Sequence, residues 1–495
     1  MRQLFEKAPT ERLKNLQWKA AVQPEGPFCY FMGSRVSFSS LSSDTTSVMV
    51  LNSRQRLTTK SNTLCDCHFI TAENADALLN SIRKAVGTIL SDAEGCSQSE
   101  ITLFWNPDDS GIQLLPSETL LETFAETLIL GSYAARLTDP VKTVNVQLLL
   151  PESLTEALTP ARIDAALSEG MRRGRAINQA RYWGDLPANV LTPHQFAQHL
   201  TGALSPFGRL NTLTERELEK EGFGGLLAVG QGSKNHPRLV VFDAAPKSVE
   251  KTVVLIGKGI TFDTGGYSIK GKQHHNEMKY DMCGAANVAA AIEILAPLME
   301  NVRLIGLMPL AENMVSADAQ RPGDVYSAHN GKTVEVYNTD AEGRLILADV
   351  LSYAAQFNPD VIIDIATLTG GTAHIAGNMA GVLCTNDDSR LPVLRKAARE
   401  AGEQFVHLEI LPEALEDLKS DVADLTNMHN RWSTQAPTMY AAAFLREFIP
   451  QKALWVHLDI ASMAWSGRTS PYLRGRGATA YGTRSMVNMV RSLCH

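Results

Sequence analysis

Acidic residues and lysines gather in two short segments of the chain, each next to an apolar run. The first segment, residues 252–284, reads TVVLIGKGITFDTGGYSIKGKQHHNEMKYDMCG. Its apolar run ends at Gly257, and charged residues follow, among them Lys258, Asp263, Lys270 and Asp281. Glycines at 259, 265 and 266 allow the backbone to turn sharply or to approach another group closely. Charged residues combined with glycines in this way are typical of a binding or catalytic site rather than of a simple loop between two elements.

The second segment, Asn338–Arg344, reads NTDAEGR and lies between a predicted strand, Thr333–Tyr337, and a predicted helix, Leu345–Gln356. Asp340 and Glu342 therefore fall at the carboxyl end of a strand and at the beginning of a helix. In open α/β sheets, ligands bind beyond the carboxyl ends of the strands. Both segments thus place acidic side chains where a ligand site is expected.

Each acidic residue also has a purely structural interpretation. Asp281 precedes a predicted helix, Gly284–Leu298, and an aspartate in this position commonly caps the helix N-terminus. Asp340 could cap the next helix in the same way, and Glu342 could be a first-turn acid that the helix dipole stabilises. These interpretations explain each residue alone and become weaker when the residues are taken together.

The four carboxylates would converge if their elements belong to one sheet. Converging buried carboxylates are unfavourable by several kcal/mol each unless cations pair with them. Two divalent cations would balance four negative charges, and carboxylates that hold two metals about 3.5–4 Å apart are the usual arrangement in hydrolases. Lys270 and Arg344 would then remain to bind an anionic oxygen and a bound anion.

Continuous apolar runs in the second half of the chain predict strands that are covered on both faces. They are Leu239–Asp243, Thr252–Gly257, Val302–Pro309, Val334–Asn338, Val361–Ala366 and Leu454–Ile460. Helical patterns alternate with these runs. We therefore expect a large catalytic α/β domain with a mixed sheet flanked by helices.

The first third of the chain predicts a smaller α/β domain. Its expected strands are Pro27–Met32, Ser47–Leu51, Glu100–Trp105 and Val144–Leu150, and its expected helices are Ala72–Asp92 and Glu118–Leu137. A further helix begins at Thr159-Pro160 and runs through Arg181, because Thr followed by Pro is a helix start signal. We expect an N-terminal domain at 1–155, a linker helix at 156–182 and the catalytic domain at 183–495.

Composition restricts the class of protein. The 495 residues carry 46 basic and 53 acidic side chains, and this net charge of −7 argues against nucleic acid as the main partner. Seven cysteines exclude a disulfide scaffold and are expected to be reduced thiols. Neither a signal peptide nor an apolar run of 18 residues is present, so we expect a cytoplasmic protein without a membrane partner.

Several motifs of this sequence resemble the leucyl (cytosol) aminopeptidase family, which uses two metal ions. They are Asn338–Leu345 (NTDAEGRL), Gly257–Lys270 (GKGITFDTGGYSIK), Leu186–Pro193, Leu226–Ser233 and His457–Ala461. The resemblance covers about residues 170–490, and the GGYSIK variant is most similar to the bacterial peptidase B branch. It implies a metallo-aminopeptidase that removes leucine-like N-terminal residues from peptides with water activated by two metals.

The resemblance also implies a role for each site residue. Asp263 and Glu342 would bridge two divalent cations, Lys258 and Asp281 would complete one metal site, and Asp340 would complete the other. Lys270 would contact the substrate carbonyl, and Arg344 would hold a bicarbonate or a water as general base. Because the ligands are one amine and otherwise oxygens, their chemistry favours Mn²⁺ or Mg²⁺, whereas the family is found with Zn²⁺ and activated by Mn²⁺ or Co²⁺.

Substrate preference and assembly follow from the same resemblance. Met278, Thr367, Gly370 and Ala461 fall where the family builds its first side-chain pocket, although they could equally be apolar core. His274 and His275 depart from the family pattern and could contact substrate or a neighbouring subunit, or form a solvated loop. The family forms hexamers, so a homohexamer is expected.

Other functions remain open from the sequence. A different two-metal hydrolase, such as a phosphatase, would use the same carboxylates, although a lysine ligand would be unusual there. A DNA-binding or regulatory member of the same fold is the second alternative. Gly331-Lys332-Thr333 lacks the remaining residues of a P-loop, and neither HExxH nor GxSxG occurs. Cys65-Asp66-Cys67-His68 fits no standard zinc module.

Overall fold

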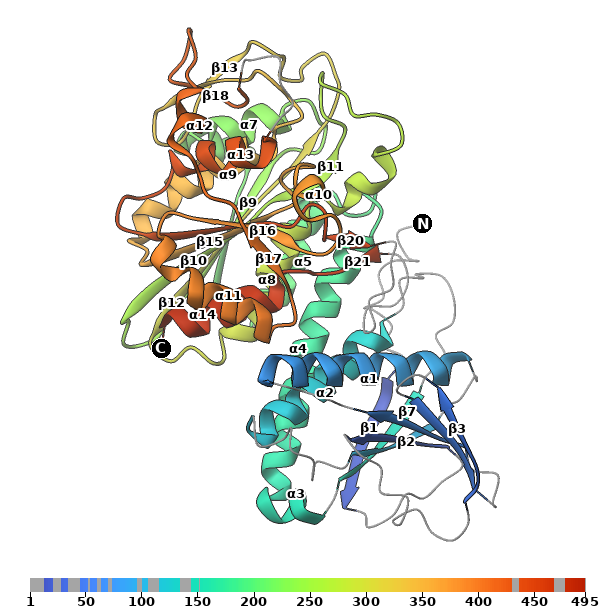
Figure 1. The fold of residues 1–495 in the computed structure, drawn as a ribbon. Coiled ribbons are helices and arrows are strands. Elements are labelled where there is room, and N and C mark those ends of the chain that lie inside the picture. Colours follow the sequence, from blue (N-terminus) through green and yellow to red (C-terminus); the bar gives the residue numbers. More distant parts are fainter. Residues whose placement is uncertain are drawn as a thin grey trace. The chain divides into compact units, whose positions relative to one another are not determined.

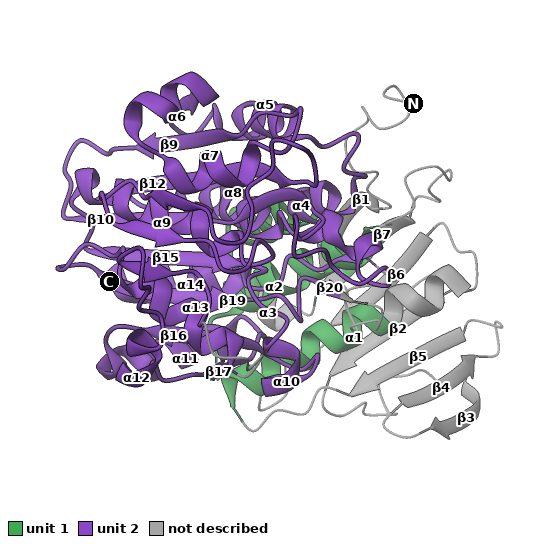
Figure 2. Cartoon of the chain, turned by 90° about the horizontal axis from the view of Figure 1, so that it is seen from above, with its two compact units in different colours: residues 1, 3–178, 468–476 green, residues 2, 179–467, 477–495 purple. Residues whose placement is uncertain are grey.

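A computed structural model describes residues 152–429, 436–466 and 477–494 of this chain without a break. Before them it describes shorter segments, residues 13–20, 28–33, 45–51, 54–59, 64–69, 74–95, 100–105, 115–133 and 144–150. The chain forms two compact units (Figure 2), unit 1 mainly from residues 3–178 and unit 2 from 179–467 and 477–495. The division falls inside helix α4 (Pro160–Asp185), and the domain limits 155 and 183 remain predictions.

Unit 1 contains a seven-stranded sheet with the order β1-β7-β6-β2-β5-β4-β3. Its strands are β1 (Leu13–Ala20), β2 (Phe28–Gly33), β3 (Thr45–Leu51), β4 (Arg54–Thr59), β5 (Leu64–Phe69), β6 (Glu100–Trp105) and β7 (Val144–Leu150). The apolar runs predicted β2, β3, β6 and β7. Strands β1, β4 and β5 were not predicted, because polar residues interrupt their apolar positions. The Cys65–His68 segment lies in β5, whose side chains are outside the described residues.

Helices α1 (Ala75–Gly95) and α2 (Ser117–Ser132) confirm the two helical patterns of unit 1. Their buried apolar side chains, such as Ile82 and Phe124, share one core cluster with Leu148 of β7. Helix α2 ends at Ser132, before the predicted end at Leu137, and residues 134–137 lie outside the described part of the chain. A short helix, α3 (Glu152–Ala157), precedes α4.

Unit 2 is organised around a mixed sheet, as predicted, with the order β17-β16-β19-β15-β10-β12-β9-β8 and with β11 paired to β12. Its strands are β8 (Arg209–Leu213), β9 (Arg238–Ala244), β10 (Lys251–Gly257), β11 (Gly259–Asp263), β12 (Val302–Asn313), β15 (Val361–Ala366), β16 (Gly381–Thr385), β17 (Phe405–His407) and β19 (Leu454–Asp459). The central strands β12, β10, β15 and β19 run parallel, so their carboxyl ends meet at one edge.

Helices cover both faces of this sheet (Figure 1). Helices α7 (Gly224–Gly230), α9 (Gly343–Tyr353) and α13 (Pro437–Arg446) share a core cluster with Val254 and Ile256 of β10. Helices α5 (Pro193–Leu204), α8 (Cys283–Leu295) and α14 (Thr483–Cys494) pack on the other side. The β10 side chains on both faces of the sheet are therefore buried, which explains why the sequence of this strand is an uninterrupted apolar run.

Smaller elements complete unit 2. They are α6 (Glu215–Glu221), α10 (Thr372–Ala376), α11 (Leu391–Glu400), α12 (Pro412–Glu416), the 3₁₀ helices His275–Tyr280, Ala354–Phe357 and Asp388–Arg390, and the short strands β13 (Val325–Ser327), β14 (Thr333–Glu335), β18 (Leu425–Thr426), β20 (Trp465–Ser466) and β21 (Gly477–Ala478). None of the helices in the described residues is long and apolar enough to cross a membrane.

The predicted strand Val334–Asn338 is wrong in its extent and in its sheet. Strand β14 ends at Glu335 and belongs to a separate three-stranded sheet with the order β13-β14-β18. The apolar signal arises because Val334 and Val336 are buried in the core cluster while the residues between them are more exposed. We expected all four carboxylates to follow elements of one sheet. Asp340 and Glu342 instead follow a strand of this smaller sheet.

Candidate metal centre

Lys258 connects the end of β10 to the start of β11 and is buried. Its ammonium lies 2.8 Å from Asp281 Oδ1 and 2.8 Å from Glu342 Oε1. A third hydrogen bond of 2.9 Å goes to the carbonyl oxygen of Thr367, just after β15. Lys258 therefore joins two acidic groups and a main-chain carbonyl from three separate parts of the chain.

Lys270 lies between the other two carboxylates. Its Nζ is 2.7 Å from Asp263 Oδ2 and 2.5 Å from Asp340 Oδ1. The chain reaches this position through a sharp turn at Gly265 and Gly266, whose φ angles of 86° and 61° lie in the left-handed region that glycine tolerates. The turn predicted from the glycines in this segment is therefore present.

The carboxylates form one buried cluster. Ligand oxygens of Asp263, Asp340 and Glu342 lie within 4.8 Å of one another. Within the described residues, Asp281 Oδ2 and Glu342 Oε2 are buried oxygens without a hydrogen-bond partner. Oxygen atoms of this kind, beside a single amine, are a donor set that suits hard divalent cations, so the residues present fit a metal centre.

The pKa values of these groups reflect burial and mutual charge. Burial raises the pKa of Asp281 and of Asp263, and the neighbouring Glu342 raises both further. Burial, Asp263 and Glu342 raise the pKa of Asp340 to about 7, although Lys270 opposes the shift. For Glu342 itself burial acts in the same direction, but Lys258 and Lys270 outweigh it and lower its pKa.

The two lysines respond in the opposite way. Burial lowers the pKa of Lys258 and of Lys270, but the surrounding carboxylates outweigh it and the pKa of each lysine is raised. Both lysines are therefore ammonium ions in the metal-free protein, where they supply positive charge inside the cluster. The cluster is stable in this form only because each lysine contacts two carboxylates.

The helix-capping interpretations do not describe these residues. The N-cap of α8 is Met282, not Asp281, and Asp281 instead receives a 2.7 Å hydrogen bond from the Thr367 hydroxyl. Glu342 is the N-cap of α9 but makes no capping hydrogen bond with its side chain. The carboxylates of both residues point to Lys258 instead.

Arg344 is buried in the first turn of α9. Its Nη1 donates a 2.7 Å hydrogen bond to the carbonyl oxygen of Asn427, and its Nε is buried without a partner in the described residues. Burial lowers its pKa to about 10, against the opposing effect of Glu342 and Asp459. The preceding residue must be glycine, since a Cβ on Gly343 would lie 2.7 Å from Lys258 Nζ.

Two further polar residues support the cluster, and the sequence interpretation missed both. Asn313, at the end of β12, donates hydrogen bonds of 2.8 Å to Asp263 Oδ1 and 2.9 Å to the Thr339 carbonyl. Thr339 in turn donates to the Gly265 carbonyl at 2.7 Å and accepts from the Ser268 amide at 2.8 Å. Asn313 could have been found, because it is a polar residue at the end of a long apolar strand.

The four residues predicted for a substrate pocket lie in different surroundings in the structure. Thr367 lies at the carboxylate cluster, where its hydroxyl and carbonyl contact Asp281 and Lys258. Met278 is half-buried in the 3₁₀ helix, and Gly370 is exposed with open space around it. The Ala461 amide donates to Asp459 Oδ1 at 3.2 Å, an oxygen that also accepts from the amide next to Thr367.

His274 and His275 lie at the start of that 3₁₀ helix. His274 is exposed and lies 3.4 Å from Gln273, and His275 is half-buried. Within the described residues, the ion pairs of the carboxylate cluster involve neither histidine. Their role stays open between a solvated loop and a contact with substrate or another subunit.

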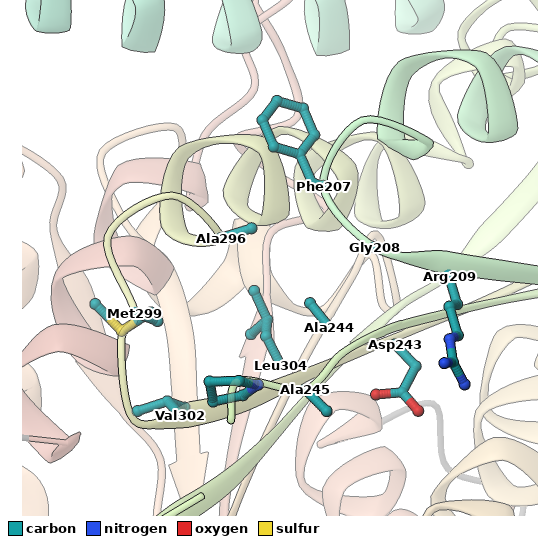
Figure 3. A pocket seen from close by; sticks show the side chains of 11 residues that line it. Phe207, Gly208, Arg209, Asp243, Ala244, Ala245, Ala296, Met299, Val302 and Leu304 are labelled. Atoms are coloured by element: carbon teal, nitrogen blue, oxygen red, sulfur yellow. The ribbon is translucent and has the colours of Figure 1, made fainter. Parts of the chain in front are cut away.

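Figure 3 shows a cavity of about 450 Å³ that none of the four clustered carboxylates lines. Arg209 and Asp243 lie at one side of it, and Met299 and Val302 at the other. It borders the beginning of β12, whereas Asn313 and the carboxylate cluster lie at the end of that strand. None of the predicted site residues lines this cavity.

Comparison with known proteins identifies the family of this chain. The model of the cytosol aminopeptidase family, catalytic domain, matches residues 178–487. A "Probable cytosol aminopeptidase" of Chlorobium luteolum is 42% identical over 339 residues, which make up 67% of this chain and 66% of that protein. That of Roseiflexus castenholzii is 39% identical over 385 residues, covering 76% of this chain and 77% of the relative.

Solved structures extend the likeness beyond the catalytic part. "Bottromycin maturation enzyme BotP in complex with Mn" has a TM-score of 0.80 at 29% identity and covers 95% of this chain and 100% of its own. A second structure, "Bottromycin maturation enzyme BotP", has a TM-score of 0.79 at 29% identity and covers 95% of this chain and 99% of its own. Since the family model spans more than half of the sequence, including every residue of the cluster, this chain belongs to the cytosol aminopeptidase family.

Proposed function

We propose that this protein is a dinuclear metal-dependent aminopeptidase that releases N-terminal amino acids, preferably leucine-like ones, from peptides. The observation that carries the proposal is the buried cluster in which four carboxylates surround Lys258 and Lys270. Family membership and the names of the relatives support the reaction class.

The metal sites would use the residues that the family resemblance implies. Asp263 and Glu342 would bridge two divalent cations, Lys258 and Asp281 would complete one site, and Asp340 the other. When bound, the cations would polarise the scissile carbonyl and lower the pKa of a water molecule from about 15.7 toward about 7. Lys258 can act as a ligand only after losing its proton, so metal binding must release that proton.

The donors and the family resemblance together indicate which cations to propose. Oxygen-rich sites favour manganese or magnesium, and one solved relative is described as a complex with Mn. We propose zinc, manganese or both in the two sites, with the site that contains Lys258 binding more tightly. The all-oxygen site completed by Asp340 would exchange its ion more readily.

Lys270 and Arg344 would supply the remaining chemistry. The Lys270 ammonium, held between Asp263 and Asp340, can donate a hydrogen bond to the carbonyl oxygen and stabilise the negative charge that develops there. Arg344 would hold a bicarbonate or a water that accepts and returns a proton. Its buried Nε, which has no partner in the described residues, supports a role in binding such an anion.

Substrate contacts, assembly and location are proposals as well. Met278, Thr367, Gly370 and Ala461 would line the pocket for the first side chain, with Thr367 offering its methyl group because its hydroxyl is bonded to Asp281. We propose a cytoplasmic homohexamer that acts on peptides with a free N-terminus. Neither a membrane nor a nucleic acid is part of this proposal.

Hydrolysis of leucine p-nitroanilide by the purified protein tests the proposed function. Assays would contain Mn²⁺, Zn²⁺ or EDTA, and an N-acetylated substrate would be compared with the free amine. We expect metal-dependent release from the free amine and none from the acetylated compound. Absence of release with either metal, across a panel of uncharged N-terminal residues, would contradict the proposal.

A further inference from the structure

Asn427 is a buried residue that follows strand β18 and lies beside the loop with Asp340. Strand β18 pairs in parallel with β14, and the Asn427 amide continues the pairing by donating to the Glu335 carbonyl at 3.0 Å. Strand β14 ends at Glu335. From this point onward the Asn427 side chain, rather than a strand, holds the backbone of the loop.

The side-chain amide of Asn427 uses its full hydrogen-bonding capacity on this single loop. Its Oδ1 accepts from the backbone amides of Tyr337 at 2.8 Å and Asn338 at 3.1 Å. Its Nδ2 donates to the carbonyls of Asn338 at 2.7 Å and Ala341 at 3.4 Å. A primary amide has one acceptor oxygen and two donor hydrogens, so only Asn matches this set at this side-chain length.

The four bonds enclose the residue that carries the site chemistry. Tyr337 and Ala341 are the two ends of the turn, and Asp340 lies between them. The carbonyl oxygen of Asn427 also accepts from Arg344 Nη1 at 2.7 Å. One buried residue thus fixes the backbone around Asp340 with its side chain and orients Arg344 with its main chain.

The remaining site residues have other supports. Asn313 and Thr339 attach the same loop to β12 and to the turn at Gly265. Lys258 and Asp281 contact each other and Thr367, and Lys258 also contacts Glu342. Among the described residues, none of these contacts involves Asn427. Loss of the Asn427 side chain should therefore disturb the part of the cluster around Asp340 and leave the part around Lys258 and Asp281 in place.

We propose that Asn427 is a positioning residue that sets the geometry of Asp340, and thereby the affinity of the cation site that Asp340 completes. This inference rests on the proposed function, in which Asp340 belongs to only one of two metal sites. Partners that orient a metal ligand typically change affinity by about 10–100-fold when they are removed. The effect of Asn427 should fall in this range and should be confined to one site.

The test is a Mn²⁺ titration of the metal-free, full-length protein, with the free ion followed by electron paramagnetic resonance. Wild type, Asn427→Ala, Asp340→Asn and the control Asn386→Ala would be compared. Asn386 also bonds backbone groups on both sides, accepting from the Trp455 amide at 2.8 Å and donating to the Ala453 carbonyl at 2.9 Å, but it does so at β16 and β19. It is thus a matched asparagine outside the cluster.

We expect two Mn²⁺ sites in wild type and in Asn386→Ala. In Asn427→Ala one site should weaken by about 10-fold or more, the same site that Asp340→Asn weakens, with the other within about twofold. The lowered kcat of Asn427→Ala should recover in part at high Mn²⁺, which a general loss of stability would not produce. If Asn427→Ala does not fold, Asn427→Asp keeps the shape and the acceptor oxygens and should show the same selective loss.

The outcomes separate the two proposals. Two sites of wild-type affinity in the Asn427 variants would overturn the role of Asn427 and leave the proposed function standing. Equal weakening of both sites would overturn it too, since Asn427 would then support the whole domain. A wild-type protein that binds neither Mn²⁺ nor, in a parallel titration, Zn²⁺ would contradict the proposed function itself, and the positioning role would fail with it.

Discussion

Lys258 and Lys270 illustrate how single residues determine the chemistry of this protein. Each lysine is enclosed by two carboxylates, yet the two lysines differ in their surroundings. Lys258 is buried and also bonded to a main-chain carbonyl, whereas Lys270 retains some exposure. This difference fits a ligand role for Lys258 and a substrate-facing role for Lys270.

The role of Lys270 leads to a prediction for Lys270→Ala. Loss of the ammonium should lower kcat by about 100–1000-fold, the usual effect of removing one donor to a developing oxyanion. Metal content, measured by elemental analysis, should stay at two ions per chain, because Lys270 is not a proposed ligand. A folded variant with normal turnover would disprove this role.

A matched control is available in Lys251, whose Nζ donates to the Leu493 carbonyl at 2.7 Å at the opposite end of β10. Lys251→Ala removes a lysine of similar burial that bonds only to main chain. Its turnover should remain within about threefold of wild type, since oxyanion stabilisation of the kind assigned to Lys270 is not involved.

At the scale of elements, helix α9 links the site to the core. Its first turn carries Arg344, and its middle carries Asp349, a buried carboxylate that accepts from the amides of Leu226 and His329, both at 2.9 Å. Asp349 thereby attaches α9 to the beginning of α7. Burial raises its pKa to about 7, although these amides oppose the shift.

This pKa predicts a change of stability with pH. An unfolded aspartate has a pKa of about 3.9, so between about pH 4 and pH 7 the folded protein binds more protons than the unfolded chain at Asp349. Its contribution to stability is therefore complete at low pH and declines as pH rises through about 7. Asp349→Asn, which does not titrate, should lack this decline.

Thermal unfolding of metal-free wild type and Asp349→Asn at pH 5 and pH 8 would measure the effect. The stability of wild type relative to the variant should be greater at pH 5 by about 2 kcal/mol, since each pKa unit corresponds to about 1.4 kcal/mol. A difference between the two proteins that does not change with pH would exclude Asp349 as the titrating group.

The elements also show where a sequence pattern is sufficient. Strands β10, β12 and β15 are long apolar runs, and both faces of the sheet are covered, so pattern and structure agree. Strand β14 is different, because alternate burial of Val334 and Val336 produces an apolar signal in a three-residue strand of a separate sheet. A short apolar run cannot show which sheet it joins.

At the scale of the whole molecule, one part of the chain contains all of the proposed metal ligands. They lie in unit 2, and the family model matches residues 178–487. Without metal, the two lysines would balance only half of the charge of four ionised carboxylates. Cations that bind the folded cluster and not the unfolded chain must therefore stabilise the protein.

The corresponding prediction concerns metal removal. Wild type in Mn²⁺ should unfold at a higher temperature than in EDTA, with a gain of about 2.7 kcal/mol for each site at which Mn²⁺ is 100 times its dissociation constant. Differential scanning calorimetry would measure the shift. Asp340→Asn should show a smaller shift, and equal unfolding temperatures of wild type with and without Mn²⁺ would argue against binding to the folded cluster.

The sequence by itself determined strands β9, β10, β12, β15 and β19 of the main sheet, the two segments with acidic residues and the family. These follow from local patterns, since strand periodicity and motif order are properties of neighbouring residues. The sequence motifs also identified every residue of the carboxylate cluster, because the motifs carry those residues at fixed spacing. Their identity needed no knowledge of tertiary contacts.

Only the tertiary structure decided how the cluster is held. Asn313 reaches Thr339 across 26 positions of sequence, and Asn427 reaches Asn338 across 89. Such bonds join a side chain to main-chain groups that every residue possesses, so no pattern in the sequence marks the partner. The fold brings these segments together, and the position of Asp340 is fixed by that distant pairing.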